Sequence, residues 1–330
     1  MTQAPVSDIE LVQDLHASRD RIFQELGKVI VGQKHIIEHI LITLLCRGHA
    51  LIIGVPGLAK TLLIKSISQI LDLKFSRIQF TPDLMPSDIT GTEIIEEDHA
   101  TGKRQFRFFK GPIFGNIILA DEINRTPPKT QAALLEAMQE YKVTAAGVSY
   151  TLDEPFLVLA TQNPIEQEGT YPLPEAQLDR FMFSVNITYP TREEEVEIVK
   201  STTSALEEEL GIVLSREKIM DYQALIRRVP VADNVVEFAV ELTSRTRPGN
   251  DTYPFINDWV DWGAGPRASQ YLILGAKARA VLEGRPTPDI SDVLTMVKPV
   301  MRHRVITNFN AEADGVTTDT VLDKLVEEAG

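Results

Sequence analysis

Residues 51–61, Leu-Ile-Ile-Gly-Val-Pro-Gly-Leu-Ala-Lys-Thr, constrain the fold of this chain more than any other segment. The apolar run 51–53 predicts a buried parallel strand, and the loop Gly-Val-Pro-Gly at 54–57 then leads through Lys60 and Thr61 into an apolar segment that predicts a helix. This order is typical of a phosphate-binding loop, in which backbone N–H groups and the start of the helix surround an anion. The alternative is a turn between a core strand and a helix, with a solvated lysine.

One position departs from the strict motif, because Ala59 stands where glycine normally precedes the lysine. We expect its methyl group to be tolerated if the backbone φ angle of Ala59 is negative. In a nucleotide site, Lys60 would contact the β- and γ-phosphates, and the Thr61 hydroxyl would hold Mg²⁺.

Residues 117–122, Ile-Ile-Leu-Ala-Asp-Glu, predict a second buried strand that ends in two carboxylates. Ligands of open α/β sheets bind at the carboxyl ends of the strands. Asp121 would therefore hold Mg²⁺, directly or through water, and Glu122 would polarise the water that attacks the γ-phosphate. A strand that ends in a solvated acidic turn is the alternative.

Residues 157–163, Leu-Val-Leu-Ala-Thr-Gln-Asn, predict a third such strand. Asn163 could hydrogen-bond the attacking water or the γ-phosphate. Because Asn-Pro is a common turn pair, a simple turn at Asn163 is the alternative.

Two arginines are further candidates. Arg180 precedes the last predicted strand, and its alternative is a surface ion pair with Asp179 or Glu175. Arg267 follows Pro266 in the first turn of a predicted helix. A cation there opposes the helix dipole, which favours an anionic partner, although an ordinary surface arginine fits as well.

Short apolar runs separated by helix-like segments predict a mostly parallel α/β sheet, with strands in 49–53, 75–80, 116–120, 156–161 and 181–187. Two hairpins are predicted as insertions, one at 91–109 with a polar turn from Asp98 to Gly102, and one at 143–156 with a turn at Gly147.

After Pro190 no strand is predicted, and the apolar spacing indicates helices over 192–209, 216–229, 233–246, 267–283 and 289–302. We therefore expect an α/β nucleotide-binding domain with N-terminal helices at 1–189, a helical domain at 190–308 and an acidic tail at 309–330. A short helix at 319–328 is expected in that tail.

The composition narrows the function. A net charge of −14 argues against general nucleic-acid binding, and the nearest basic group is Lys103, Arg104, Arg107 and Lys110. Cys46 is the single cysteine, which excludes an internal disulfide and indicates a reducing, cytoplasmic setting. Neither a signal peptide nor a transmembrane segment is expected from the sequence.

Together these segments resemble the AAA+ ATPases, specifically the MoxR group, over roughly residues 10–308. In that resemblance 54–61 is similar to the Walker A loop, 119–125 to Walker B, 160–164 to sensor 1, 175–181 to the arginine-finger segment and 265–268 to sensor 2. The resemblance implies that nucleotide is bound by the following residues: Val31, Gly32, Gln33, Gly54, Val55, Pro56, Gly57, Leu58, Ala59, Lys60, Thr61, Leu62 and Arg267.

The resemblance also implies ATP and Mg²⁺ as cofactors and a homo-oligomeric ring, a hexamer, in which Arg180 reaches the neighbouring subunit's γ-phosphate. The two hairpins would face the channel or the axial face of this ring. Its activity would be chaperone-like remodelling, with metal or cofactor insertion among the outcomes, and a von Willebrand factor A domain protein as partner. The alternatives are a magnesium-chelatase-like motor subunit, a nucleotide-switched scaffold with little turnover, and a DNA-loading motor, against which the acidic charge argues.

Overall fold

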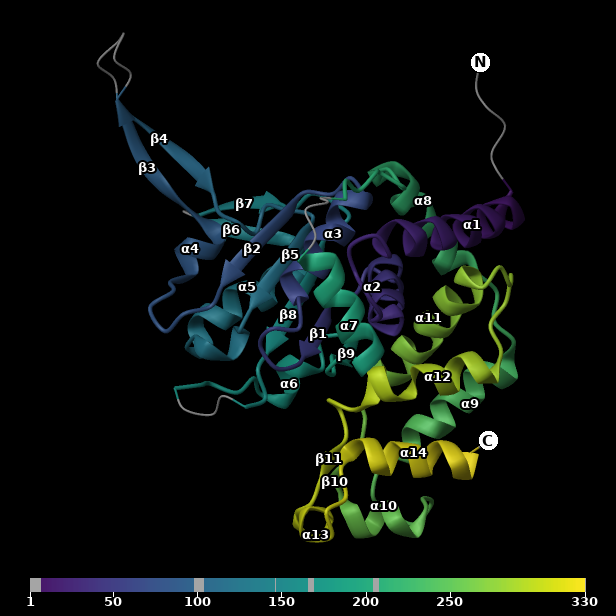
Figure 1. Ribbon diagram of the computed structural model, residues 1–330. Helices are drawn as coiled ribbons and strands as arrows, with labels where there is room; N and C mark the ends of the chain where they lie inside the picture. Colours follow the sequence, from purple (N-terminus) through teal and green to yellow (C-terminus); the bar gives the residue numbers. More distant parts are fainter. Residues whose placement is uncertain (1–6, 98–103, 146, 166–168, 204–207, 330) are drawn as a thin grey trace.

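The computed structural model describes residues 7–97, 104–145, 147–165, 169–203 and 208–329, which form an α/β domain followed by a largely helical domain (Figure 1). The predicted parallel five-stranded sheet is confirmed, with the strand order β2-β5-β8-β1-β9. Its strands are β1 (Ala50–Ile53), β2 (Phe75–Gln79), β5 (Ile117–Asp121), β8 (Leu157–Gln162) and β9 (Phe183–Asn186).

The strand order brings three predicted site segments to the same edge of the sheet. β8 lies between β1 and β5, and the three central strands are buried almost throughout because helices cover both faces. The loop after β1, the acids after β5 and the amide after β8 therefore meet at one edge. The helices of this domain are α1 (Asp8–Leu26), α2 (Lys34–Leu45), α3 (Lys60–Ile70), α4 (Pro86–Thr90), the 3₁₀ turn η1 (Ile123–Arg125), α5 (Pro128–Glu140) and α6 (Glu175–Leu178).

Both predicted hairpins are present as antiparallel pairs. β3 (Gly91–Glu97) pairs with β4 (Arg104–Lys110) and projects away from the sheet, and β6 (Lys142–Ala145) pairs with β7 (Val148–Thr151) (Figure 1). The predicted turn from Asp98 to Gly102 lies outside the described residues.

The two hairpins are joined at their bases by an aromatic stack. The Phe108 ring stacks on Tyr150 with ring centroids 4.3 Å apart. Farther out on the same face of the first hairpin, Ile95 and Phe106 pair across the strands and are 59% and 74% exposed. The base of this hairpin is therefore packed, whereas its outer part presents apolar side chains to solvent.

The C-terminal domain is not entirely helical, which corrects the prediction. A two-stranded ladder joins β10 (Val260–Trp262) and β11 (Ile306–Thr307), each too short to give an apolar run in the sequence. α7 ends at Thr202, and residues 204–207, within the helix predicted over 192–209, lie outside the described part. The helices are α7 (Arg192–Thr202), α8 (Arg216–Arg228), α9 (Asp233–Ser244), α10 (Pro254–Trp259), α11 (Pro266–Leu282), α12 (Ile290–Met301), α13 (Phe309–Ala313) and α14 (Thr318–Ala329).

The C-terminal segment is more than an acidic tail. α14 contains the expected helix, and its Val321, Leu322 and Leu325 are fully buried where it packs on α12 (Figure 1). Two of its acidic side chains, Asp319 and Asp323, also form ion pairs with basic residues at the end of α12. The proposed boundary at 308–309 remains a prediction, although the core of the helical domain extends beyond it.

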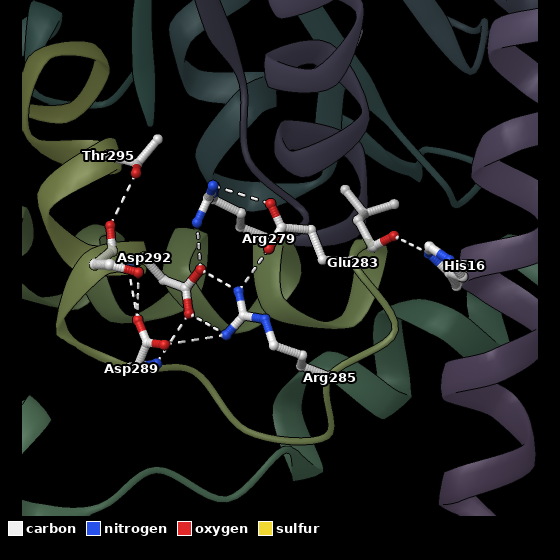
Figure 2. Close-up of polar contacts among 9 residues, drawn as sticks. His16, Arg279, Glu283, Arg285, Asp289, Asp292 and Thr295 are labelled. Carbon is white, nitrogen blue, oxygen red and sulfur yellow. Dashed lines mark hydrogen bonds and ion pairs between the residues drawn. The ribbon is translucent and has the colours of Figure 1, made fainter.

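A buried carboxylate organises the centre of the helical domain. Asp292 is 0% exposed and accepts hydrogen bonds from Arg279 at 2.5 Å and from both terminal nitrogens of Arg285 at 2.6 and 2.8 Å (Figure 2). Asp289 is the N-cap of α12, the helix that contains Asp292, and the Asp289 backbone N–H donates to the Asp292 carboxylate. Paired in this way, the buried charge fixes the turn between α11 and α12.

The two domains share one hydrophobic core. α11 contacts α1 and α2 of the first domain, and α12 packs against the edge strand β9 (Figure 1). His16 Nδ1 bonds the Leu282 carbonyl oxygen at 2.8 Å, which ties α1 to the end of α11 (Figure 2). Among the described helices, none is long and apolar enough to span a bilayer.

Candidate functional site

The loop after β1 has the geometry of an anion cradle. Lys60 begins α3, and its ammonium donates to the Gly54 carbonyl oxygen at 2.6 Å, which folds the side chain back over the loop. A side chain at Gly54 would lie 2.9 Å from the Ile187 carbonyl oxygen, so glycine is required there. Burial lowers the pKa of Lys60, and the charges of Asp121 and Glu122 oppose that shift.

Ala59 does not have the negative φ that we expected. Its φ is +54° and its ψ is +24°, in the left-handed region that favours glycine. The chain must turn sharply from the loop into α3 at this residue, and alanine accepts the conformation at a cost of about 1 kcal/mol.

A cavity of about 330 Å³ opens above this loop and brings the predicted phosphate and metal residues together. Its lining contains one residue that the sequence analysis did not propose, Arg77 of β2. The lining residues are Pro56, Gly57, Leu58, Ala59, Lys60, Thr61, Arg77, Asp121, Glu122 and Asn163. Of the remaining predicted loop residues, Val55 is partly buried and Leu62 is 46% exposed, and neither lines this cavity.

The two acidic residues are joined through Thr161 of β8. The Thr161 hydroxyl donates to Asp121 Oδ1 at 2.7 Å and accepts from the Glu122 backbone N–H at 2.8 Å. On the other side, Asp121 Oδ2 accepts from Arg77 Nε at 3.1 Å and from Arg77 Nη2 at 2.6 Å. Both carboxylate oxygens of Asp121 are therefore hydrogen-bonded.

Glu122 is held by one residue of the neighbouring strand β2 and by one residue of the turn η1 that follows it. Its backbone is left-handed, with φ +59°, and its Oε2 accepts from Gln79 Nε2 at 2.9 Å and lies 3.3 Å from Arg125 Nε. A left-handed residue other than glycine is uncommon and clusters at functional sites.

Asn163 is buried and lines the cavity, as a residue near the γ-phosphate should. Its Oδ1 also accepts from the Ile165 backbone N–H at 3.1 Å, which is the local turn contact that the Asn-Pro pair indicated. The turn and the site position are therefore compatible.

A second cavity, of about 530 Å³, is lined by the predicted nucleotide-binding residues 31–33. Gln33, which directly precedes α2, has a left-handed backbone with φ +54°. Its Nε2 lies 3.5 Å from the Leu58 carbonyl oxygen, which links Gln33 to the phosphate loop. Glu194 of α7 closes the cavity over Gly32, where an added Cβ would lie 2.2 Å from Glu194 Oε1. The lining residues are Val31, Gly32, Gln33, Lys34, His35, Ile36, Ile187, Thr188, Tyr189, Pro190, Thr191 and Glu194.

Arg180 does not line either cavity. Asp179, its expected surface partner, is engaged by Arg267 at 2.6 Å and by Arg304 at 2.7 Å. Within the described part of the chain, the Arg180 side chain has no hydrogen bond or ion pair, so its charge is available to another molecule.

Arg304 fixes the backbone that carries Arg180. Its side chain is 2% exposed and donates to the backbone carbonyl oxygens of Asp179 at 2.9 Å and Phe181 at 2.7 Å. Burial lowers the pKa of Arg304, and the hydrogen bond to Asp179 opposes that shift. Arg304 thus holds the residues that follow α6 against the segment that follows α12.

Arg267 lies with this group and not at the phosphate cavity. It begins α11 as predicted, and its Nη1 donates to Asp179 Oδ2 at 2.6 Å. The anionic partner that its position suggested is therefore a carboxylate of the same chain. The predicted site residues consequently form two groups, one at the loop and one around Asp179.

Hard oxygen ligands are what Mg²⁺ prefers, and the cavity supplies them as the Thr61 hydroxyl and the Asp121 carboxylate. With two protein ligands, Mg²⁺ would complete its coordination with phosphate oxygens and water. The residues present therefore fit a Mg²⁺–nucleotide complex.

This loop, these acids and the helical domain define the class of AAA ATPases. Residues 49–183 match the family "ATPase family associated with various cellular activities (AAA)", and residues 256–325 match the AAA lid domain. The protein is therefore a nucleotide-binding ATP hydrolase of this class.

Similar proteins narrow the class further. The chain is 40% identical to "Chaperone MoxR1" of Mycobacterium tuberculosis over 98% of this chain and 85% of that protein. It is 30% identical to "Protein MoxR" of Methylorubrum extorquens, covering 89% of each. A crystal structure of a Cytophaga hutchinsonii protein, described as a candidate ATPase, superposes with a TM-score of 0.88 at 40% identity, covering 96% of both chains. The chain belongs to the MoxR family of AAA+ ATPases.

Proposed function

We propose that this protein hydrolyses ATP within a homo-oligomeric ring, a hexamer, and uses the cycle to remodel or activate partner proteins as a chaperone. The observation that carries the proposal is the division of the site residues into two groups. The loop group can bind nucleotide within one subunit, and the Arg180 side chain has no hydrogen bond or ion pair with any described residue of its own chain.

In the loop group, the backbone N–H groups of 54–61 and the Lys60 ammonium would hold the phosphates. Thr61 and Asp121 would hold Mg²⁺, which when bound neutralises charge on the phosphate oxygens. Glu122 would orient the attacking water and accept its proton, and Asn163 would hold that water or the γ-phosphate.

Arg180 would complete the site of a neighbouring subunit. A transferred phosphoryl group gains charge on its oxygens, and an arginine supplied in trans contributes about 10³–10⁵ in rate where it completes such a site. Arg267 donates a hydrogen bond to Asp179, the residue directly before Arg180. We therefore assign both arginines to this interface.

The projecting hairpin is the proposed partner-binding element. Ile95 and Phe106 are exposed on one face of it, and unpartnered apolar side chains of this kind favour contact with another protein. We propose a von Willebrand factor A domain protein as the partner, with metal or cofactor insertion as one outcome. The chaperone name of the mycobacterial relative supports the remodelling role.

The proposed setting is the cytoplasm, because a sequence with a single cysteine, Cys46, has no internal disulfide and suits a reducing compartment. Nucleic acid is not proposed as a partner. Lys103, part of the basic group considered for it, lies outside the described residues, and Arg107 pairs with Glu96 at 3.1 Å.

The Glu122→Gln variant tests the catalytic role and separates an ATPase from a nucleotide-switched scaffold. We expect turnover to fall by at least about 10²-fold with nucleotide affinity nearly unchanged, since the amide keeps the shape but cannot accept the proton. Steady-state hydrolysis and equilibrium binding of ATP measure the two quantities. Lys60→Ala is the comparison variant, and it should lose affinity instead. Equal turnover in Glu122→Gln and wild type would contradict the proposal.

A further inference from the structure

We propose that the Arg77 guanidinium acts as an internal cation that competes with Mg²⁺ for Asp121. This inference rests on the proposed function and concerns how the same site is regulated. Arg77 would hold the Asp121 carboxylate until Mg²⁺ arrives with ATP, and the ion pair would have to break for the metal to bind.

The contact between Arg77 and Asp121 blocks one oxygen of the carboxylate. Two guanidinium nitrogens, Nε at 3.1 Å and Nη2 at 2.6 Å, donate to the same Oδ2. Thr161 donates to the other oxygen, Oδ1, at 2.7 Å. A metal that approaches Asp121 from the cavity therefore meets a carboxylate with both oxygens engaged.

Arg77 is placed to reach this position and to leave it. It lines the same cavity as Thr61, and its side chain is 47% exposed on the edge strand β2. Its Nη2 also donates to Gln79 Oε1 at 2.5 Å, so the guanidinium is held by two acceptors and not by packing. It can move into solvent without disturbing the core.

Mg²⁺ that binds Asp121 directly competes with the guanidinium for Oδ2, because the two nitrogens occupy both lone-pair sites of that oxygen. Mg²⁺ binds carboxylate oxygens at about 2.0–2.1 Å and demands nearly ideal octahedral geometry. A guanidinium nitrogen at hydrogen-bond distance from the same oxygen would crowd that shell and repel the metal. Metal binding therefore includes the cost of breaking the ion pair, and by reciprocity bound metal weakens the pair.

The test is the Mg²⁺ dependence of nucleotide binding by the full-length chain, measured with a fluorescent, non-hydrolysable ATP analogue. Arg77→Gln should lower the Mg²⁺ concentration at half-maximal effect by about two- to fivefold, the range of an exposed ion pair. Affinity for the analogue in EDTA should stay at the wild-type level. Arg77→Lys keeps the charge but loses the two-nitrogen contact, so its Mg²⁺ midpoint should lie between those of wild type and Arg77→Gln.

Arg245→Gln is the matched control. Arg245 donates through Nε at 3.0 Å and Nη2 at 2.6 Å to one oxygen of Glu241, which is the same contact placed on α9 of the helical domain. This variant removes an identical charge and should leave the Mg²⁺ midpoint unchanged.

Three results would overturn the inference. An unchanged or higher Mg²⁺ midpoint in Arg77→Gln would show no competition. A loss of affinity in EDTA would make Arg77 a phosphate ligand. An equal shift in Arg245→Gln would make the effect one of net charge. If Arg77→Gln does not fold, the Mg²⁺ midpoint of Arg77→Lys decides the question.

The failure of this inference can be distinguished from the failure of the proposed function. Wild-type protein that neither binds nor hydrolyses ATP would refute the proposed function itself, whereas an active wild type with an unshifted variant refutes only the role of Arg77.

Discussion

At the scale of single residues, His49 shows how a buried side chain can set the response of the protein to acid. The Val158 backbone N–H donates to His49 Nδ1 at 3.0 Å, so the proton lies on Nε2, which donates to the Met138 carbonyl oxygen at 3.1 Å. Burial lowers the pKa of His49 to about 4, and the bond to Met138 opposes that shift. The neutral ring thus joins α5 to β8.

His49→Gln should make stability less sensitive to acid. The folded-state pKa lies below the unfolded value, so the contribution of His49 is fully present above about pH 6.5 and is lost as pH falls toward 4, at up to about 1.4 kcal/mol per pH unit. Denaturant unfolding at a series of pH values measures this slope. An equally steep slope in the variant would show that His49 does not titrate as described.

The site residues that could be predicted from the sequence are those that belong to a short local motif. Lys60, Thr61, Asp121, Glu122 and Asn163 were all expected, and the structure brings them to one cavity. Their partners in the structure were missed, namely Thr161, Arg77, Gln79 and Arg125. The contacts of Thr161, Arg77 and Gln79 join different strands, so they depend on a strand order that no single segment encodes, whereas Arg125 lies three residues after Glu122 in the same turn. Alternation along 75–79, which places Arg77 and Gln79 on one face, was the available signal.

At the scale of elements, the buried Arg304 bonds the backbone on both sides of Arg180. Arg304→Lys keeps the charge but loses the fork that bonds the carbonyl oxygens of Asp179 and Phe181. We expect a loss of about 1–3 kcal/mol in the free energy of unfolding. We also expect a lower kcat in the assembled protein with ATP affinity unchanged, because in the proposed ring the displaced Arg180 would no longer reach the neighbouring subunit.

Denaturant unfolding, ATP binding and hydrolysis measure these effects, with Arg245→Lys as the control for an arginine outside the segment. Arg304→Lys that lost ATP affinity but kept its kcat would contradict a positioning role for Arg304.

The stack between the two hairpins gives a further prediction for elements. Phe108→Ala removes the contact with Tyr150 and should increase amide hydrogen exchange in β3, β4, β6 and β7 by several-fold, since such a pair contributes about 0.5–1.5 kcal/mol. Phe106→Ala is the matched control, because Phe106 is 74% exposed and its loss should leave exchange unchanged. Equal exchange in the two variants would show that the hairpins are independent.

Element prediction succeeded where apolar runs are long and failed where they are short. All strands of the main sheet were expected, because buried parallel strands leave continuous apolar runs. The β10–β11 ladder was missed because Ile306–Thr307 is too brief to show a pattern. α14 was expected as a helix, but its packing on α12 depends on a long-range contact that the acidic composition obscured.

At the scale of the whole molecule, the helical domain and the sheet form one packed body, so movement at one site can be transmitted to the other. Asp179 accepts from Arg267 of α11 and from Arg304 beyond α12, and it precedes Arg180 in the chain. The interface residues and the helical domain are therefore mechanically linked. The sequence indicated each arginine separately, but not that one carboxylate joins them.

The most direct test of the central claim, that Arg180 completes a neighbour's site, mixes two inactive variants. Arg180→Ala and Lys60→Ala should each be nearly inactive alone, with subunit exchange confirmed by energy transfer between labelled chains. In mixtures, an Arg180→Ala subunit supplies an intact phosphate loop and its Lys60→Ala neighbour supplies the arginine. The account predicts that ATP hydrolysis partly recovers and is highest at intermediate ratios. No recovery at any ratio, despite confirmed exchange, would contradict it.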